Sequence, residues 1–98
     1  MYYTYVLQSM KDMGFYTGLS KELKLRFEQH NKGLVESTRH RRPFRLIYYE
    51  ACLDENDAKK REKYLKTFHG KTFLRKRLKS YLTGPALIKT MPQDEKNI

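Results

Sequence analysis

Hydrophobic and aromatic residues gather in short blocks between polar stretches, and the first blocks predict two paired strands. Residues 2–9 read Tyr-Tyr-Thr-Tyr-Val-Leu-Gln-Ser, a composition rich in the aromatic and β-branched residues that strands favour. Residues 11–14 have the composition of a turn, and residues 15–18 read as a second strand. Because the two blocks lie so close in sequence, the pattern predicts a β-hairpin.

A helical pattern follows the hairpin. Ser20 is a good N-cap for a helix that runs to about residue 31, and Gly33 suits the position just after it. Leu23 and Phe27 are four residues apart, so both are expected to face the core. The polar and basic stretch 32–43 then reads as a loop.

The second half of the chain predicts one strand and two helices. Residues 44–53 form a strand rich in aromatic and branched residues, and Asp54 caps a helix over about 55–68. Gly70 is expected to separate this helix from a last one over 71–82. The apolar set of the last helix is Phe73, Leu74, Leu78, Tyr81 and Leu82.

The order of these elements is β-β-α-β-α-α, which predicts an α+β fold with a small three-stranded sheet covered by helices. A length of 98 residues limits the chain to one domain, here residues 1–83. Residues 84–98 are polar and are expected to form a flexible C-terminal tail. A domain of this size has room for one core and one shallow site.

The charge balance changes this picture most. Lys and Arg total 21 against 11 acidic residues, a formal net charge of +10. A basic surface attracts polyanions and favours nucleic acid as a partner, although a basic composition can also serve solubility alone. Eight Tyr and five Phe argue against a disordered basic tail, since such segments are poor in aromatic residues.

The cysteine content and the apolar runs exclude several classes. Cys52 is the only cysteine, so the sequence allows neither an intramolecular disulfide nor a metal site built on cysteine pairs. A reducing, cytoplasmic location is the natural expectation. The N-terminus does not have the pattern of a signal peptide, and no apolar run reaches the ~20 residues that span a bilayer.

Arg26 and His30 border the apolar stripe of the first predicted helix. At about 100° per residue, both fall within one arc with Leu23 and Phe27. Arg offers a planar fork of donors that suits a phosphate, and His titrates near neutrality and can move a proton. The alternative is that Arg26 extends to solvent and His30 is an ordinary residue of the helix edge.

Glu62 is a carboxylate on the core side of the second long helix, in one row with Ala58 and Leu65. Buried carboxylates are usually paired or bind a metal, and Mg²⁺ needs only one or two of them. The alternative is an ion pair within the helix, for example with Lys59.

Tyr5 and Tyr16 come from the two paired strands, at positions of matching parity that share a face. An unperturbed Tyr has a pKa of about 10, so it needs a nearby cation to act as a base at neutral pH. Taken singly, each is better explained as a core aromatic.

Basic and hydroxyl side chains in the 32–43 loop are expected to contact phosphates, unless the loop is simply a solvated surface. Lys24 on the preceding helix joins them as an expected nucleic-acid contact. The loop residues in this set are Thr38, Arg39, His40, Arg41 and Arg42.

Together these residues resemble the paired motif of the GIY-YIG nucleases. Tyr3-Thr4-Tyr5 is followed about ten residues later by Tyr16-Thr17-Gly18, which keeps the Tyr and Gly of the second motif. Arg26 and His30 match the Arg-x-x-x-His helix of that family, and Glu62 matches its metal-binding Glu. The stretch 38–49 resembles the single-domain bacterial branch that is called excinuclease-C-like.

The resemblance implies hydrolysis of DNA phosphodiesters with one divalent cation, Mg²⁺ or Mn²⁺, held by Glu62. It also implies that Arg26 binds the phosphate, that Tyr5 is the base with His30 as its helper, and that Tyr16 orients water or phosphate. Branched or single-stranded DNA, or RNA, stays open as substrate, and targeting by a partner protein is compatible with the absence of a second domain. The alternative function is a non-catalytic nucleic-acid-binding module with the same fold.

Overall fold

A three-stranded antiparallel sheet forms the centre of the computed structural model, which describes residues 1–85 and 87. The strands are β1 (Tyr2–Ser9), β2 (Phe15–Ser20) and β3 (Phe44–Cys52), in the spatial order β2-β1-β3. The predicted hairpin is confirmed, because β1 and β2 pair directly and Tyr5 lies opposite Gly18. The β1–β3 pairing contains a bulge at Val6/Leu7.

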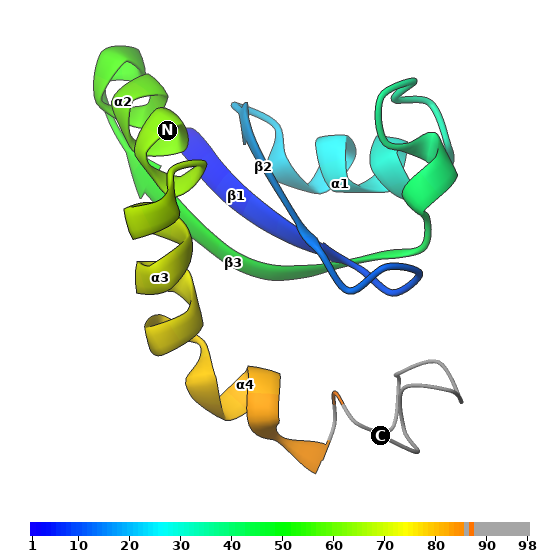
Figure 1. Cartoon of the computed structure of the whole chain (residues 1–98). Coiled ribbons are helices and arrows are strands. Elements are labelled where there is room, and N and C mark those ends of the chain that lie inside the picture. Colours follow the sequence, from blue (N-terminus) through cyan, green and yellow to red (C-terminus); the bar gives the residue numbers. More distant parts are fainter. Residues whose placement is uncertain (86, 88–98) are drawn as a thin grey trace.

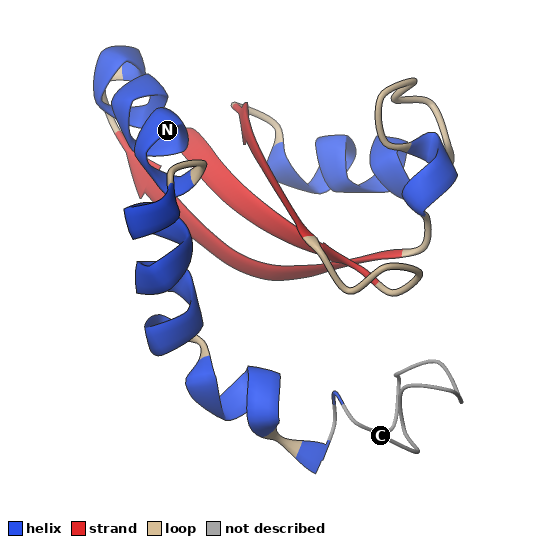
Figure 2. Cartoon of the chain, in the orientation of Figure 1, coloured by secondary structure: helices blue, strands red, loops and turns tan. Residues whose placement is uncertain are grey.

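Helices cover both faces of this sheet (Figures 1 and 2). The helix α1 (Leu23–Asn31) lies on one face, and α2 (Glu55–Leu65) and α3 (Phe68–Arg77) lie on the other. A short helix α4 (Lys79–Thr83) follows α3. The predicted α+β class and its β-β-α-β-α-α order are therefore confirmed, with the last helix divided in two. None of the helices in the described part of the chain is long and apolar enough to cross a membrane.

Side chains of the central strand β1 alternate between two separate cores. Tyr5 and Leu7 point to the α1 side and pack with Phe44, while Val6 points to the other side and packs with Leu65 and Leu74. This is the period-2 alternation of a strand that is covered on both faces. Leu23 and Phe27 pack against the first of these cores, as the helical spacing predicts.

The helix ends differ from the predictions where backbone contacts override local signals. The prediction of Ser20 as the N-cap is wrong: α1 begins at Leu23 with Glu22 as its N-cap, and the Ser20 hydroxyl accepts a hydrogen bond from the Glu22 N–H before the helix. Gly33 has the predicted role after the helix, with a φ of +78°. Asp54 caps α2 as expected, through the Asn56 N–H.

Gly70 was expected between two helices but lies within the first turn of α3. Thr67 is the N-cap of α3, and its hydroxyl accepts from the Gly70 N–H. A Cβ at residue 70 would meet the backbone carbonyl oxygen of Tyr64 at 2.1 Å, so the glycine allows α3 to start directly against the end of α2. The prediction of an interhelical Gly70 is therefore wrong. Most of the predicted tail 84–98 lies outside the described residues.

Candidate active site at the edge strand

Tyr5 reaches across the edge strand because its neighbour in register has no side chain. A Cβ at Gly18 would lie 2.4 Å from the Tyr5 hydroxyl, so only glycine leaves room for the phenol there. Tyr16, two residues earlier on β2, lies on the same face, with its ring centroid 6.4 Å from that of Tyr5. The predicted sharing of a face by the two tyrosines is confirmed.

His30 is completely buried beneath these two rings and is hydrogen-bonded through both nitrogens. Its Nε2 lies 2.9 Å from the Tyr5 hydroxyl, and its Nδ1 lies 2.8 Å from Thr38 Oγ1. The Thr38 hydroxyl donates to the Val35 carbonyl oxygen at 3.4 Å, so it accepts from Nδ1–H. That assignment leaves Nε2 as the acceptor for the Tyr5 O–H.

The imidazole of His30 is neutral at pH 7. Burial, with a smaller contribution from the charge of Arg26, lowers the pKa of His30 from 6.5 to about 4. The alternative interpretation of His30 as an ordinary residue of the helix edge does not fit its complete burial.

The pKa of Tyr5 depends on Tyr16, Arg26 and Glu62 as well as on burial. The pKa of Tyr5 is raised to about 12, mainly by burial, with smaller contributions from the Tyr16 phenol and the Glu62 carboxylate. Arg26 acts in the opposite direction, both as a hydrogen-bond donor and as a positive charge. These electrostatic contributions show that Arg26 and Glu62, from helices on opposite faces of the sheet, both act on the same phenol.

Arg26 and Glu62 keep part of their side chains in solvent. Arg26 is half-buried, and one guanidinium nitrogen lies 3.3 Å from the side-chain oxygen of Gln29 on the same helix. The Glu62 side chain is 25% exposed and forms an ion pair with Lys66 at 3.4 Å. The alternative partner Lys59 pairs with Glu55 instead.

One carboxylate is a suitable donor set for a hard cation that keeps most of its water ligands. Within residues 1–85 and 87 no group of three or more His, Cys, Asp or Glu side chains is placed to hold a metal ion. A fully protein-ligated metal centre is therefore not built into the described part of the chain. Glu62 fits Mg²⁺ or Mn²⁺ only if substrate oxygen and water supply the other ligands.

The predicted nucleic-acid contacts other than Thr38 divide into three groups. Arg39, His40 and Arg42 are exposed, and Arg42 donates to the carbonyl oxygen of Arg39. Arg41 is held by Asp12 through two hydrogen bonds of 2.7 and 3.2 Å. Lys24 lies elsewhere, in a hollow of about 380 Å³ between α1 and residues of β1 and β3.

Thr38 corrects the prediction for the loop. Only 1% of Thr38 is exposed, because its hydroxyl is bonded to His30 instead of facing solvent. Its expected role as a surface phosphate contact is wrong. Its hydroxyl instead holds the His30 imidazole in place. Sequence reasoning missed this partner because the loop folds back over α1 through the short 3₁₀ helix η1 (Arg39–Arg41).

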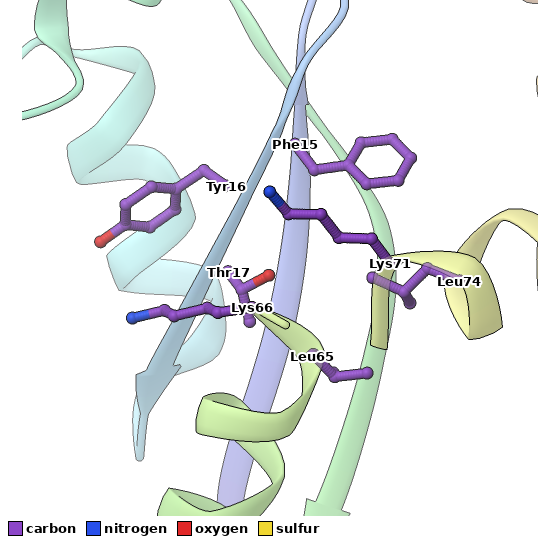
Figure 3. Close-up of a pocket in the computed structure, with 7 residues that line it drawn as sticks. All are labelled: Phe15, Tyr16, Thr17, Leu65, Lys66, Lys71 and Leu74. Atoms are coloured by element: carbon purple, nitrogen blue, oxygen red, sulfur yellow. The ribbon is translucent and has the colours of Figure 1, made fainter. Parts of the chain in front are cut away.

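Two further residues belong to the site. Gly18 gives space to Tyr5, and an isolated glycine within a strand pattern is the signal for such a close approach. Lys66, one turn after Glu62, ends on the same side of β2 as the Tyr16 hydroxyl in Figure 3. It lines a hollow of about 190 Å³ together with Tyr16 and Thr17.

Comparison with known proteins places the chain in a family. Residues 1–81 match the family model of the GIY-YIG catalytic domain. A UPF0213 protein of Clostridium perfringens is 39% identical over 67 residues, covering 67% of this chain and 71% of that protein. A UPF0213 protein of Staphylococcus saprophyticus is 38% identical over 68 residues, covering 68% and 82%.

Among solved structures, the solution NMR structure of a UPF0213 protein from Bacillus halodurans is similar. It is 31% identical, with a TM-score of 0.48, and the match covers 89% of this chain and 92% of that one. The family model and the relatives together show that the chain belongs to the GIY-YIG family of nuclease domains. The resemblance of its paired motifs to those of the GIY-YIG nucleases is thereby confirmed as family membership.

Proposed function

We propose that this protein is an endonuclease that hydrolyses phosphodiester bonds in DNA with one divalent cation. The supporting observation is the convergence of Tyr5, Tyr16 and His30 from three separate elements, with a buried hydrogen bond of 2.9 Å between Tyr5 and His30. Such convergence has no evident structural purpose, since an aliphatic core would stabilise a domain of this size at least as well.

Arg26 binds the phosphodiester in this proposal. The Arg26 side chain is partly exposed, and its planar guanidinium fork matches two oxygens of a phosphate. Glu62 holds Mg²⁺ or Mn²⁺, and a bound divalent cation supplies neutralisation of the negative charge on the phosphodiester. The ion pair between Lys66 and Glu62 is weak enough to open, because both side chains reach solvent.

Tyr5 serves as the base, and His30 is its hydrogen-bonded helper. The Tyr5 hydroxyl lies 2.9 Å from Nε2 of the imidazole, so His30 fixes the orientation of the phenol, which loses its own proton to solvent before it takes one from the attacking water. Arg26 favours the phenolate by its charge. Tyr16 lies beside both rings, 5.0 Å from the imidazole centroid, where it orients water or phosphate.

The test is cleavage of labelled linear, nicked, branched and single-stranded DNA with Mg²⁺, with Mn²⁺ and with chelator. Arg26→Ala should lower the cleavage rate about 10²- to 10³-fold, the usual effect of removing one electrostatic donor. Arg26→Lys should also be slow, because a point charge does not replace the fork. Lys60→Ala, an exposed cation on α2, is the matched control.

Unchanged melting temperatures must accompany these losses, since Arg26 is not part of either core. If wild-type protein binds the DNA panel but cleaves none of it with either metal, the protein is instead the non-catalytic binding module. If Arg26→Ala and Lys60→Ala cleave equally well, the proposed phosphate site is wrong.

A further inference from the structure

The segment from residue 63 to residue 85 is cationic without compensation. It contains seven Lys and Arg residues and no Asp or Glu. Elsewhere some basic side chains form ion pairs with acids, as Arg41 does with Asp12 and Arg61 with Glu50. In the described part of the segment, the one ion pair is that of Lys66 with Glu62. The α3 region is therefore a positively charged surface that attracts a polyanion.

Three of these cations follow the edge of the sheet away from the candidate active site. Lys66 and Lys71 line the hollow of about 190 Å³ beside Tyr16. Lys71 and Arg75 line a second hollow of about 250 Å³, which shares Phe15 with the first. The two hollows thus form one continuous surface beside β2, and Figure 3 shows the Lys71 ammonium directed toward that strand.

An exposed aromatic side chain lies next to this surface. Phe68 is 75% exposed, although a Phe of a small domain gains most from burial. It lies three residues before Lys71 and seven before Arg75, so all three share one face of α3. An aromatic ring beside phosphate-binding cations is the arrangement on which unpaired bases stack.

We propose that Lys66, Phe68, Lys71 and Arg75 form a binding strip for a single strand of nucleic acid that leaves the catalytic site along β2. The cations bind successive phosphates and Phe68 stacks on one base. The occupant is a single strand, because the face of a base inside a duplex is not accessible to a side chain. This inference rests on the proposed function for its orientation, but the strip binds without metal or cleavage.

The cationic half of the strip is tested by fluorescence anisotropy with a labelled single-stranded oligonucleotide and the corresponding duplex, in chelator. The variant Lys71→Gln/Arg75→Gln is compared with Lys59→Gln/Lys60→Gln, which removes the same charge from the exposed surface of α2. Loss of two phosphate contacts should lower the slope of log K against log salt by about 1.4 and weaken single-strand binding roughly twentyfold at about 0.1 M salt. The control variant Lys59→Gln/Lys60→Gln should change the salt slope and the single-strand affinity less.

The aromatic half has a different signature. Phe68→Ala should weaken single-strand binding by about five- to a hundredfold without changing the salt slope, and Phe68→Tyr should restore it. Duplex binding should not respond to either substitution. Duplex binding as tight as single-strand binding, or a Phe68→Ala variant that binds like wild type, would overturn the strip.

The same data separate the strip from the nuclease proposal. Normal strip binding by a protein that cleaves nothing refutes the proposed function alone. The strip alone is refuted if the wild-type protein cleaves efficiently, Phe68→Ala binds like wild type, and Lys71→Gln/Arg75→Gln binds like Lys59→Gln/Lys60→Gln.

Discussion

The two faces of the sheet are equally well buried but differ in chemistry. On the side of α2 and α3, Val6, Leu65 and Leu74 form an aliphatic core. On the side of α1, Tyr5 and His30 are as completely buried, and they are joined by hydrogen bonds. Every buried side-chain nitrogen and oxygen of the described residues has a hydrogen-bond partner.

This difference indicates what each face contributes. Burial of aliphatic side chains stabilises a fold by about 1.5–3 kcal/mol each, whereas a buried hydrogen bond contributes only about 0.5–1.5 kcal/mol net. The α1 face therefore holds a more costly and less stabilising set of groups in a fixed geometry. Such an arrangement is expected where side chains are positioned for chemistry.

Removing an aliphatic residue should have the largest effect on stability. Leu65→Ala leaves a cavity in the core under α2 and should lower the free energy of unfolding by about 2–5 kcal/mol. Urea denaturation measures this loss, with the 83% exposed Leu53→Ala as the control. Cleavage per folded molecule should stay unchanged. A loss below that of the control would mean that this face does not carry the fold.

Low pH should destabilise the protein through the α1 face, because His30 becomes protonated there. The folded-state pKa of His30 is about 4 and its unfolded value is about 6.5, so the unfolded chain binds more protons between these values. Stability should therefore fall as the pH falls from 6.5 toward 4, by about 3 kcal/mol in total. Unfolding free energies at several pH values check the prediction.

The control for this titration is His30→Gln, which has no imidazole to protonate. Its stability should vary less than that of wild type between pH 6.5 and 5. The Asp12 carboxyl does not interfere in this window, because the Arg41 guanidinium lowers its pKa to about 2. Equal pH slopes for the two proteins would contradict the burial of a neutral imidazole.

The sequence predicts the polar face only in part. Strand parity predicted that Tyr5 and Tyr16 share a face, and helical spacing predicted that His30 borders the core side of its helix, because strand and helix periods are rigid geometric rules. The same rules gave no hint that Thr38 would bind His30, since a loop has no period and its path depends on tertiary contacts. The prediction for Gly70 was wrong for a related reason, because the role of this residue is set by the approach of two helices.

A smaller loss of stability is expected from Tyr5→Phe. The substitution keeps the ring in place over Gly18 but leaves the buried Nε2 of His30 without its partner. One unsatisfied buried group costs about 1–3 kcal/mol. Thermal denaturation compares this variant with Tyr49→Phe, whose ring is 53% exposed. In the proposed mechanism Tyr5→Phe also abolishes cleavage, whereas Tyr49→Phe does not.

Glu62→Gln should change stability least among these variants and still abolish cleavage. It removes an exposed i, i+4 ion pair with Lys66, which is worth about 0.3–0.5 kcal/mol, or roughly 1–4 °C in melting temperature. The amide is nearly isosteric with the carboxylate but lacks the charge that a hard cation requires. We therefore expect cleavage to be lost and binding of Mn²⁺, followed by its paramagnetic resonance, to weaken strongly.

The chain contains a matched control for this variant on the same helix. Glu55 forms an i, i+4 pair with Lys59 at 2.8 Å, so Glu55→Gln removes an equivalent ion pair far from Tyr5. Both variants should lose similarly little stability, but only Glu62→Gln should lose Mn²⁺ binding and cleavage. If Glu62→Gln cleaves DNA with the metal dependence of wild type, Glu62 holds no cation. The site on the α1 face would then work without the Glu62 carboxylate of α2, whose charge raises the pKa of Tyr5.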